Sequence, residues 1–271
     1  MECLMREISY SIISACLVAI VLLACCGCGE DKGAAVNVVG STSVQPFAEY
    51  LAQEYGKQGF QVEVQGGGST AGLQAVTNGL ADIGMCSRAL KGEEAEKYQG
   101  IVIARDGLAI VVNPANPIKD LTLAQLREIF SGKARNWKEF GGLDGPIRPI
   151  SREEGSGTRE SFVKLVMGKE RIARAAITQE SNGAVKELVK GDRAAIGYMS
   201  LGLVGTEVKT ITVDGAKPTH EDVISGTYKL TRPFLFVLKG QASPEAQKFI
   251  DYVLSETGQK LLESEGLVRA K

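Results

Sequence analysis

The segment FQVEVQGGGSTAGLQAVTN, residues 60–78, combines three local patterns. Apolar and polar residues alternate over 60–65, which predicts a strand. Glycines and hydroxyl residues follow at 66–70, and we expect a helix over 71–78 that ends at Gly79. A strand that leads through a small-residue turn into a helix is the repeating unit of α/β proteins.

The same unit recurs on both sides of this segment. A strand over 36–40 leads through Ser41-Thr42-Ser43 into a helix over 47–55, and a strand over 147–150 leads through 151–158 into another helix. Repeated alternation predicts an α/β fold with largely parallel strands. In such sheets ligands bind at the carboxyl ends of the strands, where the helices begin.

Two long apolar segments organise the chain. We expect a strand over 101–112, interrupted at Arg105-Asp106-Gly107, and a second strand over 233–238. The chain is predicted to leave a discontinuous first domain at about 108–113 and to return at about 232–238, so that two crossing strands form a hinge.

The amino-acid composition excludes few classes of protein function. The chain has 271 residues, of which 44% are hydrophobic and 23% charged, as in ordinary globular proteins. The net charge is -1 and no long run of Lys or Arg occurs, which argues against a nucleic-acid partner. Five of the six cysteines lie before residue 29 and only Cys86 lies in the globular part, so we expect neither a disulfide framework nor a metal site.

The N-terminus has the pattern of a bacterial lipoprotein signal. Residues 12–24 are almost wholly apolar but shorter than the about 20 residues of a membrane span. Leu22-Leu23-Ala24-Cys25 fits a lipobox, which predicts a signal peptide and anchor over 1–28, cleavage before Cys25, a lipid on its thiol and a polar tether over 29–35. The alternative is an uncleaved anchor helix. Both place the protein outside the cytoplasm and on a membrane.

Three turns carry the candidate chemistry, at 40–43, 66–70 and 155–158. A helix start offers unpaired N–H groups and partial positive charge, glycine allows close approach, and hydroxyls donate hydrogen bonds. Together these groups predict an oxyanion site, to which Arg152 adds a full charge on a planar fork. Each turn taken alone could be no more than a helix cap.

Other functions have weaker support. Gly66-x-Gly68-x-x-Ala71 is a loose match to a dinucleotide fingerprint, but Asp82 comes too early for its acidic residue. Ser156 lies in no nucleophile elbow, and the one histidine, His220, is expected on the solvated surface. We therefore expect a binding protein, not an enzyme.

Six motifs in order give a resemblance to a known family. The chain resembles the phosphate-binding proteins of bacterial phosphate ABC transporters, the PstS family, over about residues 38–268. The matching motifs lie at 40–46, 66–72, 82–88, 129–138, 152–159 and 195–198.

The resemblance implies a two-lobed periplasmic binding protein of type II, with mostly parallel sheets, flanking helices and two hinge strands. Lobe 1 would comprise 36–110 and 232–271, and lobe 2 would comprise 111–231. It implies a monomer without a cofactor that captures inorganic phosphate between the lobes and delivers it to ABC transporter permease subunits. The alternatives are another tetrahedral oxyanion, such as sulfate, or a sensor module without transport.

The resemblance also implies roles for particular residues. Glu154 would pair with Arg152 and hold its guanidinium. Ser87 stands where better-known members have an Asp that accepts the phosphate proton, and a hydroxyl can also accept. Arg88 is expected as a second cationic ligand, with pairing to an acidic side chain as the alternative. The predicted phosphate ligands are Thr42, Ser43, Ser69, Ser87, Arg88, Arg152, Ser156, Gly157 and Thr158.

Overall fold

The computed structural model describes residues 35–270. The predicted signal peptide, the lipidated Cys25 and the tether up to residue 34 lie outside the described residues. Within 35–270, no helix has both the length and the apolar character needed to cross a membrane.

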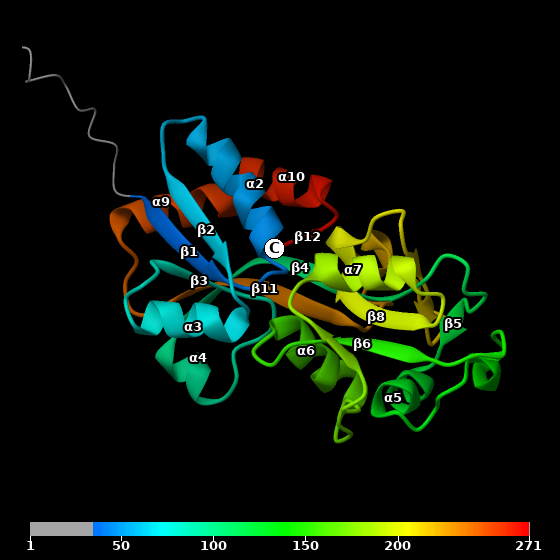
Figure 1. The fold of residues 1–271 in the computed structure, drawn as a ribbon. Helices are drawn as coiled ribbons and strands as arrows, with labels where there is room; N and C mark the ends of the chain where they lie inside the picture. Colours follow the sequence, from blue (N-terminus) through cyan, green and yellow to red (C-terminus); the bar gives the residue numbers. More distant parts are fainter. Residues whose placement is uncertain (1–34, 271) are drawn as a thin grey trace, which may run out of the picture. The chain divides into compact units, whose positions relative to one another are not determined.

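One half of the fold is built on three parallel strands and two long antiparallel ones (Figure 1). The strand order is β2-β1-β3-β11-β4, and β1 pairs in parallel with both β2 and β3. Its strands are β1 (Val36–Gly40), β2 (Val62–Gly66), β3 (Ile83–Cys86), β11 (Thr231–Leu238) and β4 (Gln99–Val112). Its helices are α2 (Gln45–Gly56), α3 (Ser69–Thr77), α4 (Glu93–Lys97), α9 (Pro244–Leu254) and α10 (Glu256–Ser264).

The other half continues from the far end of β4 in the order β4-β8-β6-β7. Its main strands are β6 (Arg148–Arg152), β7 (Ile177–Gln179) and β8 (Ala195–Ser200). Its helices are α5 (Leu123–Ser131), α6 (Gly157–Phe162), the π-helix η2 (Val163–Met167), α7 (Asn182–Gly191) and α8 (His220–Ser225). Short elements are β5 (Asp120–Leu121), η1 (Trp137–Phe140), η3 (Leu201–Leu203), β9 (Lys209–Thr210), β10 (Thr212–Val213) and β12 (Val268–Arg269).

Three apolar cores lie along β4, one of which contains Ala109 and Val111 and packs on α7. Ile103 and Ala104 belong to a core with α2 and α9, whereas Leu108 and Ile110 belong to a core with α5 and α6. Since β4 and its partner β11 each run through the sheet as long strands, they are the physical link between these cores. The mixed α/β fold with flanking helices is confirmed, and the lobe limits stay predictions.

The predicted interruption of the strand over 101–112 is wrong. β4 runs without a break from Gln99 to Val112, because Arg105, Asp106 and Gly107 all pair with β11. Asp106 faces Arg232 directly in this register, and the two side chains form an ion pair with 2.9 Å between Nη2 and Oδ2. The negative charge of Asp106, which suggested an interruption of the strand, is therefore neutralised by Arg232 inside the sheet.

Candidate functional site

The three predicted turns come together at the carboxyl ends of β1, β2 and β6. The Thr70 amide donates to the Gly155 carbonyl at 3.1 Å, which joins the second turn to the third. Gly157 lies against Ser69 and Ser87, and only glycine fits there, because a Cβ would lie 2.2 Å from Ser69 Oγ and 2.6 Å from Ser87 Oγ. Gly68 has a φ of 93°, a conformation that glycine adopts without strain.

Ser41, Ser69 and Ser87 form a buried hydroxyl cluster on one side of this junction. Ser41 Oγ donates to Ser87 Oγ at 2.8 Å, and the Ser87 amide donates to Ser69 Oγ at 3.1 Å. Because Ser87 Oγ accepts from Ser41, its own proton is available for a different acceptor. Ser69 Oγ, which lies 3.4 Å from Ser87 Oγ, also keeps its proton or shares it with Ser87.

Ser43 and Thr158 meet across the site, with 2.6 Å between their hydroxyl oxygens. Asn182 Nδ2 donates to Ser43 Oγ at 2.9 Å, and Arg232 Nη1 donates to Thr158 Oγ1 at 2.6 Å. Each hydroxyl thus accepts from a fixed donor and still owns one proton. Their mutual bond uses only one of these protons, so the other can point at an anion.

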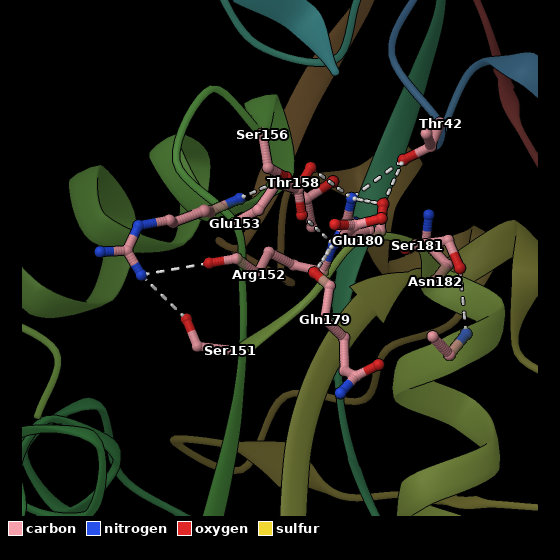
Figure 2. A network of polar contacts seen from close by, with 12 residues as sticks. Thr42, Ser151, Arg152, Glu153, Ser156, Thr158, Gln179, Glu180, Ser181 and Asn182 are labelled. Carbon is pink, nitrogen blue, oxygen red and sulfur yellow. Dashed lines mark hydrogen bonds and ion pairs between the residues drawn. The ribbon is translucent and has the colours of Figure 1, made fainter. Parts of the chain in front are cut away.

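Arg152 ends β6 with its side chain 1% exposed. Its Nε donates to Glu153 Oε2 and to the Gln179 carbonyl, both at 3.0 Å. Its Nη2 donates to Thr42 Oγ1 and to the Glu180 carbonyl, both at 2.9 Å, and to Glu153 Oε1 at 3.0 Å (Figure 2). Its Nη1 is buried and has no hydrogen-bond partner among residues 35–270. A buried N–H without an acceptor is costly, so Nη1 is the donor that a bound anion would satisfy.

The acidic partner of Arg152 is Glu153, and the prediction of Glu154 is wrong. The Glu154 side chain is 95% exposed and approaches only Arg159, at 3.9 Å. Adjacent residues of the turn after β6 face in different directions, and the half-buried Glu153 turns back toward Arg152. The sequence placed two glutamates here and gave no signal for choosing between them.

Arg88 pairs with acidic side chains, which was the alternative to its predicted ligand role, and the ligand role itself stays a prediction. Nη1 and Nη2 donate to the two carboxylate oxygens of Glu94 at 2.7 and 3.0 Å. Nε lies 2.7 Å from Glu160 Oε2. The hydrogen bond from Arg88 lowers the pKa of Glu94, so this carboxylate is charged near neutral pH. Two carboxylates therefore face the guanidinium, although Nε itself forms no hydrogen bond within the described residues.

The remaining predicted ligands lie at the junction. Thr42 accepts from Arg152, and Ser156 caps α6 by accepting from the Arg159 amide at 3.3 Å. Ser156, Gly157 and Thr158 are all buried. Their direct role in holding a ligand stays a prediction.

Four residues of the site were missed by sequence reasoning: Ser41, Asp106, Asn182 and Arg232. Arg232 and Asp106 are fully buried, and the ion pair between them fixes the guanidinium that donates to Thr158. Burial raises the pKa of Asp106, and the charge of Arg232 opposes that rise. The available signal was the presence of charged residues within long apolar strands, Arg105 and Asp106 in β4 and Arg232 in β11, since buried charges are kept only when they are paired.

His220 is only partly solvated, in contrast to the prediction. It begins α8, where it is half-buried, and its Nδ1 is buried without a partner among the described residues. Nothing connects it to the hydroxyl cluster.

Several known proteins are similar to this chain in sequence and in fold. The PBP superfamily domain matches residues 29–257. The phosphate-binding protein PstS of Bacillus subtilis is 34% identical over 239 residues, which cover 86% of this chain and 79% of that protein. A phosphate ABC transporter substrate-binding protein from Clostridium perfringens, solved with bound phosphate, is 40% identical with a TM-score of 0.85, over 88% of this chain and all (100%) of that one. An ABC-type phosphate transport receptor from Vibrio cholerae is 40% identical with a TM-score of 0.73, over 86% of this chain and 99% of that one.

Proposed function

The chain belongs to the PBP superfamily and, within it, to the PstS phosphate-binding proteins, and on that premise we propose that it captures inorganic phosphate and hands it to an ABC transporter. Its relatives are substrate-binding proteins, not enzymes. The observation that carries the proposal is Arg152 Nη1, a buried cationic donor without a partner among the described residues, on a guanidinium that contacts Thr42 in the turn that also holds Ser43.

Phosphate binding to these groups follows from their charges. A dehydrated dianion needs several hydrogen bonds to offset its lost hydration. Arg152 supplies charge, and Ser43, Ser69, Ser87 and Thr158 supply hydroxyls that are already oriented by neighbouring donors. Because they come from loops after β1, β2, β3 and β6, an anion bound to one half would draw in the other and stabilise a closed state.

Selectivity has an unusual basis here. Ser87 has no negative charge, and the buried carboxylate of Asp106 is paired with Arg232. A site made of donors suits any tetrahedral oxyanion, so a sulfate-like ligand is the second candidate. We propose that phosphate is preferred because the Ser87 oxygen can still accept the one proton that HPO4 has and sulfate lacks.

The cellular setting belongs to the same proposal. The lipobox before Cys25 supports export, lipidation and attachment to a bacterial membrane, either in the periplasm or on the outer face of the cell. Capture by a monomer and release at the permease subunits of a transporter would then occur beside that membrane. Metabolic labelling with a clickable palmitate analogue tests the anchor, since the Cys25→Ala chain should incorporate none.

Calorimetric titration of the mature chain with phosphate, sulfate and arsenate tests the function. We expect the tightest binding for phosphate, with arsenate similar because of its shape and proton. Tighter binding of sulfate would favour the second candidate. No binding of any of the three would contradict oxyanion capture.

A further inference from the structure

Two cavities adjoin the site and differ in charge. The larger, of about 610 Å³, lies between residues 88–92, the segment 159–165 and the start of β11, and we name it the cationic mouth. The smaller, of about 420 Å³, is lined by Thr42, Gln45, Gly66, Gly67, Glu153 and Glu180, and we name it the acidic mouth. Both are within the range of small-ligand cavities.

Each mouth has a lining residue that is hydrogen-bonded to a residue of the candidate site. Arg232 lines the cationic mouth and donates to Thr158 Oγ1 at 2.6 Å. Ser161 lines it as well, and its Oγ donates to the Ser87 carbonyl at 3.2 Å. Thr42 lines the acidic mouth and accepts from Arg152 at 2.9 Å. An anion could therefore reach the site from either side.

The charges distinguish the two routes. Among the cationic mouth's residues, Arg88 and Arg232 are matched by Glu94 and Asp106. Arg159 is matched by Glu154, which leaves Lys91 and Lys164 against the single carboxylate of Glu160. Lys164 is exposed and forms no ion pair within residues 35–270.

The acidic mouth has no cationic residue in its lining. Glu153 is paired with Arg152, whereas Glu180 is exposed and adds a negative charge at the opening. Charges of one sign in a cleft raise the local concentration of the opposite ion, and they act over about 10 Å at 0.1 M salt. An anion is thus attracted at one mouth and repelled at the other.

Glu160 links the two sides of the cationic mouth. It lies on α6, whose Phe162 belongs to one core, and it forms ion pairs with Arg88 Nε at 2.7 Å and with Lys91 Nζ. Arg88 and Lys91 follow β3, whose Met85 belongs to a different core. Opening this mouth requires these ion pairs to break.

We propose that phosphate enters and leaves through the cationic mouth and that Glu160 is the residue that holds this mouth closed. The inference rests on the proposed function, because it names the route to the same site. An incoming phosphate is drawn by Lys164 and Lys91. Once it is bound, the ion pairs of Glu160 delay its release.

Stopped-flow measurement of phosphate association and dissociation tests the route. Lys164→Gln should lower the association rate several-fold at about 20 mM salt, and the difference should disappear at about 500 mM, where charges are screened within a few ångströms. Lys248→Gln is the matched control, because it removes the same positive charge from an exposed position. Lys248 lies on α9 and lines neither mouth. The control variant should bind as the unmodified chain does.

Glu160→Gln tests the closing role separately. It should raise the dissociation rate several-fold and leave the association rate equal or higher, since one negative charge is removed from the entrance. An association rate for Lys164→Gln equal to that of Lys248→Gln would overturn the route, and an unchanged dissociation rate for Glu160→Gln would overturn the closing role. If the unmodified chain bound no phosphate, the proposed function itself would fail, and the route with it.

Discussion

Arg152 and Arg88 are both buried arginines at or just after the end of a strand, yet their surroundings differ. The Arg88 side chain is 5% exposed and that of Arg152 is 1% exposed. Both terminal nitrogens of Arg88 donate to Glu94, and its Nε lies 2.7 Å from Glu160 Oε2 as an ion pair without a hydrogen bond. Arg152 faces one carboxylate, and one of its nitrogens has no partner among residues 35–270. Burial alone therefore does not mark a binding residue; Arg88 has two carboxylates against its one charge, whereas Arg152 has one carboxylate and a terminal nitrogen left for an anion.

The largest effect should come from Arg152→Ala. It removes a buried, fully charged donor whose Nη1 has no partner among residues 35–270, so phosphate affinity should fall by more than about 10-fold. Calorimetry measures the loss, and a matched thermal melt shows that the fold persists. Unchanged affinity would remove Arg152 from the site.

Arg88→Met should act mainly on stability. It leaves Glu94 and Glu160 without their cation, and because both carboxylates are partly exposed we expect a loss of about 2 kcal/mol in the free energy of unfolding. Urea denaturation gives this value. Phosphate affinity should fall only by the few-fold that the loss of one Glu160 ion pair adds to the dissociation rate. A loss of affinity as large as that of Arg152→Ala would identify Arg88 as a ligand.

Ser87→Ala should weaken the binding of phosphate more than the binding of sulfate. It removes a hydroxyl that can both donate and accept, at a cost of about 1 kcal/mol for phosphate. Sulfate has no proton to offer, so its binding should weaken less. Parallel titrations with both anions check this, and equal losses would show that Ser87 does not read the proton.

The smallest effect concerns Glu94 and depends on pH. Arg88 lowers the pKa of Glu94 in the folded chain, so the pair stabilises the protein above the unfolded pKa of about 4.3 and this contribution is lost as the pH falls through the folded pKa. Because Glu94 is partly exposed, Glu94→Gln should cost about 1 kcal/mol or less at pH 7. Urea melts at pH 7 and pH 3 should show the difference shrinking on acidification; a constant difference would argue against the ion pair.

Local patterns were sufficient for much of the fold and for the position of the site. The strand–turn–helix units around Ser43, Ser69 and Thr158 are each encoded within about 20 residues, and α/β topology brings their turns to one edge. The choice of Glu153 over Glu154 depends on side-chain direction in a turn, which spacing does not encode. The pairing of Asp106 with Arg232 depends on the register between β4 and β11, two strands distant in the sequence.

A crystal structure of the mature chain grown with phosphate tests the contrast between the two arginines most directly. We expect a phosphate oxygen at about 2.8 Å from Arg152 Nη1, with Ser43, Ser69, Ser87 or Thr158 donating to the others and Arg88 still paired with Glu94 and Glu160. A phosphate bound at Arg88, or an Arg152 Nη1 that faces solvent while phosphate binds elsewhere, would contradict this assignment.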